Sequence, residues 1–113
     1  MTKQELQYRV LKLLEQRPDM TQREIAEKLN VSLGKAHYLL KALIDIGWIK
    51  FDNFQNSNNK WGYAYLLTPK GIYQKAAITS RFLVKKQQEY NELHLQIQQL
   101  KKEVKQQQNL KQD

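Results

Sequence analysis

Residues 21–47 hold two short amphipathic segments separated by a brief polar turn, and this stretch limits the possible folds more than any other. Thr21 followed by Glu24 is typical of a capping box, in which each side chain satisfies a free backbone N–H group at a helix start. Met20 and Ile25 occupy the positions of a hydrophobic staple around that start. The apolar residues that follow recur at helical spacing: Ile25, Ala26 and Leu29.

The turn between the two segments favours a second helix in a new direction. Asn30 tolerates a left-handed backbone, and Ser32 is a good N-cap. The second helix then presents an inner apolar face made of Ala36, Leu39, Leu40 and Leu43. Gly47 is a plausible end for it. The sequence therefore predicts a helix-turn-helix.

The outer face of the second helix carries most of the functional information. Its residues are Ser32, Leu33, Gly34, Lys35, His37, Tyr38 and Lys41. Lys35 stands at the third helical position, where the positive end of the helix dipole does not stabilise a cation. A phosphate there would be stabilised both by the dipole and by the Lys35 ammonium. We expect Lys35, His37, Tyr38 and Lys41 to face the major groove of DNA, because a second helix of this kind is the usual recognition helix. Phosphates would be held by Ser32 and by the residues that open the first helix, Thr21, Gln22 and Arg23. The alternative is a plain helical hairpin with a solvated polar face.

Composition agrees with a polyanionic partner. The 113 residues have a formal net charge of +8, which favours nucleic acid over an acidic small substrate. Without cysteine there are neither disulfides nor thiolate metal ligands. The polar N-terminus is unlike a secretory signal, and no apolar run reaches the roughly 18 residues of a membrane span. We expect a cytoplasmic protein with no catalysis, no cofactor and no metal site, because no candidate nucleophile or base accompanies the scattered carboxylates.

The chain before the helix-turn-helix predicts a supporting helix over residues 2–17, which Pro18 ends. Its buried stripe is expected to consist of Leu6, Val10, Leu13 and Leu14. Tyr8 and Leu11 are then exposed and offer a less favoured alternative surface for dimerisation.

After Gly47 the pattern changes to that of two strands, residues 48–54 and 60–68, joined by the turn-forming residues 55–59. Beside a helix-turn-helix, such a hairpin is best interpreted as a wing. Asn56, Asn58 and Lys60 are its candidates for contact with phosphates or a minor-groove edge. The alternative is a solvated loop. Most of the hairpin aromatics are expected in the core rather than in base stacking: Trp48, Phe51, Trp61, Tyr63 and Tyr65.

Thr68 and Pro69 predict the start of a last helix that runs to about Leu110. Its second half has apolar residues at alternating spacings of three and four, with branched residues at one seam position and leucines at the other. That choice favours a parallel two-stranded coiled coil. We expect a homodimer held by Leu83, Tyr90, Leu93, Ile97, Leu100 and Val104. The alternative is a solvated tail rich in Gln and Lys.

Several segments together resemble the MarR-type winged-helix regulators over residues 3 to about 90. These are Val31-Ser32, residues 43–49 (LIDIGWI) and residues 67–71 (LTPKG). Residues 65–72 and 79–83 are similar to a small subgroup associated with exopolysaccharide (EPS) genes. The resemblance implies a bacterial DNA-binding transcriptional regulator, usually a homodimer. The Asn-rich wing tip differs from the Arg and Asp that the family often has there.

The expected fold is mainly α with a small β-hairpin, a winged helix-turn-helix over residues 1–70 followed by a long dimerisation helix over residues 71–113. The expected partners are double-stranded DNA and a second copy of the chain. The other function considered is a winged-helix interaction module whose basic helix binds a protein or RNA. Neither an effector nor the operator can be inferred.

Overall fold

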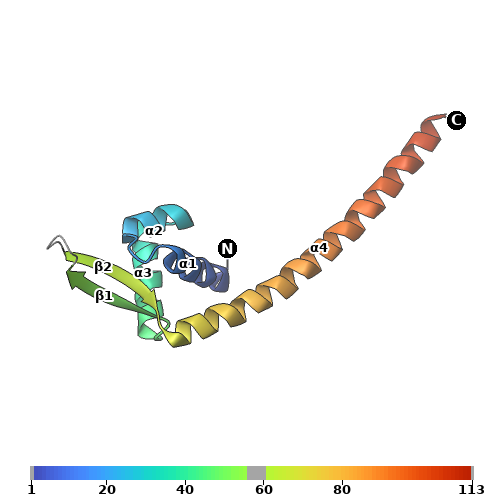
Figure 1. Cartoon of the computed structure of the whole chain (residues 1–113). Helices are drawn as coiled ribbons and strands as arrows, with labels where there is room; N and C mark the ends of the chain where they lie inside the picture. Colours follow the sequence, from blue (N-terminus) through green and yellow to red (C-terminus); the bar gives the residue numbers. More distant parts are fainter. Residues whose placement is uncertain (1, 56–60, 113) are drawn as a thin grey trace. The chain divides into compact units, whose positions relative to one another are not determined.

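The computed structural model describes residues 2–55 and 61–112 (Figure 1). The order of elements is that of a winged helix with a long last helix: α1 (Lys3–Gln16), α2 (Gln22–Leu29), α3 (Leu33–Asp45), β1 (Ile49–Gln55), β2 (Trp61–Leu67) and α4 (Pro69–Gln112). The predicted fold class is confirmed, and the helix and strand ends lie within a few residues of those expected.

The helix starts follow the local signals in the sequence. Thr21 and Glu24 form a complete capping box, and the Thr2 hydroxyl accepts a hydrogen bond from the Glu5 N–H at 3.1 Å. Asn30 adopts a left-handed backbone with φ 58°, so it ends α2 and turns the chain towards α3. After α3, Gly47 has φ 79°, a conformation that glycine adopts without strain.

The core of the winged helix lies among α1, α2, α3 and the two strands. Its fully buried side chains come from all of these elements and include Val10, Leu14, Ile25, Leu40, Leu43 and Ile49. Met20 and Ile25 are both buried around the start of α2, at 1% and 0% exposure, as the staple pattern predicts.

One prediction about α1 is wrong. Leu11 was expected on the exposed side, but it is completely buried, and Tyr8 is half-buried. The reason is that α1 contacts α2, α3 and β2, so its buried face is wider than a single stripe. Leu13, by contrast, is only partly buried at the edge of this face. Leu11 therefore belongs to the core and cannot supply a dimer surface.

The hairpin is antiparallel, and its register pairs Ile49 with Leu67 and Phe51 with Tyr65. The Tyr65 N–H donates to the carbonyl of Pro18, in the loop between α1 and α2, at 2.9 Å. The Thr68 N–H donates to the Trp48 carbonyl at 3.0 Å and closes the base of the hairpin. The wing is therefore tied to the loop after α1 and closed at its base.

The aromatic residues of the hairpin divide between core and surface. Tyr65 is 5% exposed, and Trp48 and Tyr63 are partly buried against the core. Phe51, however, is 49% exposed, so its assignment to the core is wrong. Phe51 pairs with the buried Tyr65 but lines a surface groove beside the starts of α2 and α3, so one side of its ring stays open to solvent. The side chain of Trp61 lies outside the described residues.

The helix α4 begins with a Thr68 cap, whose hydroxyl accepts from the Gly71 N–H at 3.1 Å and donates to the Gly47 carbonyl. The chain divides into two compact units at Thr79 and Ser80. The first turns of α4 thus belong with the winged helix, where the Lys75 ammonium meets the Glu15 carboxylate at 2.8 Å. Within the residues described, no helix combines the length and the apolar character needed to cross a membrane.

Candidate nucleic-acid interface

The helix α3 has one buried face and one exposed face. Ala36, Leu40 and Leu43 are buried in the core. Gly34, Tyr38 and Lys41 each precede one of these buried residues by two positions. Two positions correspond to about half a turn of the helix, so these residues lie on its opposite side, and all three are exposed. Tyr38 in particular is 64% exposed. The outer face predicted for α3 is therefore present as a continuous exposed surface.

The starts of α2 and α3 have the same cap geometry but different electrostatics. The Glu24 N–H donates to the Thr21 hydroxyl at 3.0 Å, and the Lys35 N–H donates to the Ser32 hydroxyl at 3.1 Å. At the start of α2, the Glu24 carboxylate complements the positive end of the helix dipole. The first turn of α3 has no acidic residue. The start of α3 is therefore available for an external anion.

Three exposed cations on α3 or at the start of α2 have no carboxylate partner among the described residues: Arg23, Lys35 and Lys41. Elsewhere, cations do find such partners. Arg17 meets Glu24 at 3.1 Å, and Lys86 meets Glu89 at 3.2 Å. The exposed positive charge of these residues would attract a polyanion.

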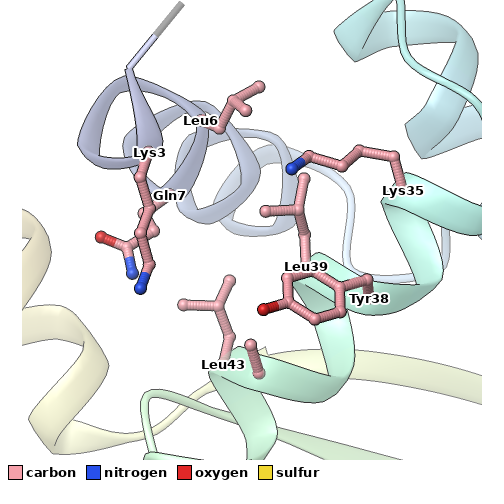
Figure 2. Close-up of a pocket in the computed structure, with 8 residues that line it drawn as sticks. Lys3, Leu6, Gln7, Lys35, Tyr38, Leu39 and Leu43 are labelled. Carbon is pink, nitrogen blue, oxygen red and sulfur yellow. The ribbon is translucent and has the colours of Figure 1, made fainter.

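On the side towards α1, Lys35 and Tyr38 border a pocket of about 250 Å³, with Lys3, Leu6 and Gln7 of α1 on its opposite side (Figure 2). The Lys35 ammonium lies 5.7 Å from the centre of the Tyr38 ring. This separation allows a cation–π contact, which positions the ammonium at the surface without neutralising its charge.

On the side towards the wing, a chain of hydrogen bonds connects three elements. The Gln22 Nε2 amide of α2 donates to the Tyr65 hydroxyl of β2 at 3.0 Å. The Gln22 Oε1 oxygen lies 3.3 Å from the His37 Nδ1 nitrogen of α3. With one ring nitrogen engaged in this way, His37 has its Nε2 nitrogen free for another partner.

A groove of about 430 Å³ lies between the helix starts and the wing, and we call it the wing groove. Its lining residues are Thr21, Gln22, Arg23, Leu33, Phe51, Tyr63 and Tyr65. The Phe51 ring contacts two other aromatic rings of this groove. Its centroid lies 5.9 Å from that of Tyr63 and 5.3 Å from that of Tyr65. The pKa of Tyr63 is raised above its ordinary value of 10.0, mainly by burial and to a smaller extent by the nearby Tyr65. This hydroxyl is therefore neutral at neutral pH.

The structure brings the predicted residues of the two helix starts together around one surface, and their role in DNA binding stays a prediction. Asn56, Asn58 and Lys60 lie outside the described residues. The predicted dimer residues lie on α4 beyond Thr79, in the other unit. The sequence analysis missed Phe51 and the link from Tyr65 to Gln22. Strand alternation contained part of the signal, because Phe51 shares a strand face with Ile49.

Comparison with known proteins identifies the same architecture. Residues 3–50 match the family described as winged helix-turn-helix DNA-binding. No curated protein matches the sequence.

Solved structures extend the likeness beyond residue 50. A PadR-like transcriptional regulator from Bacillus cereus is 22% identical, with a TM-score of 0.68 over 78% of this chain and 90% of that one. MepR, a transcription regulator of the Staphylococcus aureus multidrug efflux pump MepA, is 26% identical, with a TM-score of 0.57 over 74% of this chain and 60% of that one.

The transcriptional regulator SlyA is 25% identical, with a TM-score of 0.57 over 72% of this chain and 56% of that one. The chain thus spans less than two thirds of the length of MepR and of SlyA. Its exposed helix face, its hairpin and these comparisons agree with one another. Residues 3–50 thus match the winged helix-turn-helix DNA-binding family, and the chain has a fold similar to those of the PadR-like regulator, MepR and SlyA.

Proposed function

We propose that the protein binds a specific double-stranded DNA site as a homodimer and regulates transcription there. The observation that carries this proposal is the exposed face of α3, which has no acid in its first turn and lies beside cations without carboxylate partners among the described residues. Lys35, His37, Tyr38 and Lys41 enter the major groove, and Thr21, Gln22 and Arg23 contact phosphates.

The dimer forms through α4. Its apolar side chains Leu83, Tyr90, Leu93, Ile97, Leu100 and Val104 are all between 41% and 69% exposed in the single chain. A second copy would cover this stripe, with Ile97 and Val104 at one seam position and Leu93 and Leu100 at the other. Glu89 and His94 flank the seam at positions that face each other across a parallel pair.

The dimer has its own test. Ile97→Lys places a charge in the seam, so sedimentation should show a monomer where the parent protein is a dimer. A matched change outside the seam, Leu95→Lys, should leave the dimer intact, although Leu95 is as exposed as its neighbours at 64%. A dimer that survives Ile97→Lys would place the interface elsewhere.

The target genes follow from the resemblance of residues 65–72 and 79–83 to the EPS-associated subgroup, and we propose an exopolysaccharide gene cluster as the site of action. As a DNA-binding regulator, the protein is expected in the cytoplasm.

Selection of binding sites from a random duplex pool, at near-physiological salt, tests the function directly. A two-fold symmetric motif is the expected result, because a symmetric dimer presents its two recognition helices to two half-sites. Binding without enrichment that vanishes as salt rises would mean that the net charge acts alone. The interaction module that binds a protein or RNA would then be the better description.

A further inference from the structure

Two exposed apolar side chains line the wing groove, one from α3 and one from β1. Leu33 is the first residue of α3 and is 46% exposed, and Phe51 of β1 is 49% exposed. The apolar residues at the centre of α3 are buried, with Leu39, Leu40 and Leu43 at 5% exposure or less. Leu33 therefore lies outside the core, in a surface that is otherwise polar and basic.

The chemistry of duplex DNA offers few partners for such a side chain. Along the base edges of the major groove, the apolar group is the C5 methyl of thymine, and all other edge positions are hydrogen-bond donors or acceptors. The other apolar surface of DNA is the sugar, which lies on the backbone. Contacts with the bases are made mainly by the first residues of a recognition helix.

The position of Leu33 favours the base over the sugar. Leu33 and His37 are one helical turn apart, so they lie on the same side of α3, next to the exposed Gly34. Arg23, Gln22 and the start of α2 occupy the adjacent wall of the wing groove, where a phosphate is expected. This arrangement gives the backbone a polar site and leaves the apolar side chain for a base edge.

We propose that Leu33 contacts the C5 methyl of a thymine in each half-site, with Phe51 completing the apolar wall, and makes that position specific for thymine. This inference rests on the proposed function and adds to it one base and the residue that recognises it. No hydrogen bond is involved, so the selectivity comes from burying one methyl group.

The experiment replaces thymines one at a time by deoxyuridine in the duplex obtained from site selection. Deoxyuridine lacks the methyl group and keeps the same base pairing. At one position per half-site, the dissociation constant should rise about fourfold, as expected for losing one buried methyl group. The other thymines should change affinity less.

Leu33→Ala then assigns the effect to this residue. Because Leu33 is exposed at the surface, its truncation should leave the fold intact, and thermal unfolding checks this. The variant should bind the thymine and deoxyuridine duplexes equally well at the sensitive position. Ile44→Ala is the matched control, since Ile44 is also on α3 and is 37% exposed but lies far from the wing groove, and it should retain the fourfold difference.

Three results would overturn the inference. A duplex insensitive to deoxyuridine at every position would show that no methyl group is recognised. A Leu33→Ala variant that keeps both the full difference and the parent affinity would assign the methyl to another residue. A variant that keeps the difference but binds both duplexes more weakly by the same factor would indicate a sugar contact. Failure of the proposed function is distinct from all three, because no enriched motif would be found at all, and both proposals would then end.

Discussion

The starts of α3 and α4 look alike in the sequence and differ in what surrounds them. Ser32 caps α3 and Thr68 caps α4, and each hydroxyl accepts the N–H of the residue three positions later at 3.1 Å. Each start also contains a glycine, Gly34 or Gly71. A Cβ atom added at Gly71 would lie 1.9 Å from the Trp48 carbonyl oxygen, whereas one added at Gly34 would meet nothing within 4 Å.

This difference separates a residue needed for folding from one that the fold does not need. Gly71 lets the start of α4 lie against the turn after α3, which positions the base of the wing. Gly34 has no such reason in the chain itself, and it lowers helix stability by about 1 kcal/mol relative to Ala. Its position on the exposed side of the first turn of α3 suggests an external surface that approaches the backbone closely.

The largest effect is expected from Gly71→Ala. The added methyl group collides with a backbone carbonyl that cannot move without shifting the turn, so the free energy of unfolding should fall by about 3 kcal/mol. Chemical denaturation measures this change. An unfolding free energy within error of the parent protein would show that the turn adjusts easily, and the contrast between the two glycines would lose its basis.

Lys35→Glu should separate stability from DNA binding. A Glu at this position gives α3 the capping pattern of α2, so stability should rise by about 0.5 kcal/mol. Affinity for the selected duplex should fall by more than about tenfold, because an attractive charge facing the polyanion becomes a repulsive one. Lys12→Glu has the same change in net charge on an exposed part of α1 and is the control. Equal losses in the two variants would remove Lys35 from the interface.

Gly34→Ala should also change stability and binding in opposite directions. Unfolding free energy is expected to rise by about 1 kcal/mol from helix propensity alone, since the methyl group meets open space. The dissociation constant for the selected duplex should increase about tenfold if the groove floor lies against this backbone, a loss comparable to that of one specific base contact. Unchanged affinity would mean that Gly34 faces solvent in the complex.

The smallest effect is expected from Tyr65→Phe. This change removes the hydroxyl that holds Gln22 and leaves the buried ring in place. Affinity should fall about threefold, the value of one modest hydrogen bond. The loss should be confined to the base pair that His37 contacts, as measured by binding to single-base variants of the selected site. A uniform loss over all sites would indicate a general effect on the wing instead.

Local order in this protein could be predicted from the sequence to a large extent. The capping box at Thr21, the left-handed Asn30 and the cap at Ser32 depend on side chains within three residues of the backbone groups that they satisfy. The apolar spacing of α3 also determines which face is exposed. Signals of this kind act at short range and need no knowledge of the rest of the chain.

The tertiary structure decided what the local signals could not. Leu11 is buried because three elements pack around α1, and Phe51 is half exposed because it lines the wing groove at the surface. The hydrogen bond from Gln22 to Tyr65 joins residues 43 positions apart, and the wing groove is lined by residues of α2, α3 and both strands. The sequence by itself therefore determined the elements and the face of the recognition helix. Only packing determined which distant side chains complete that face, because burial and contact depend on all the elements at once.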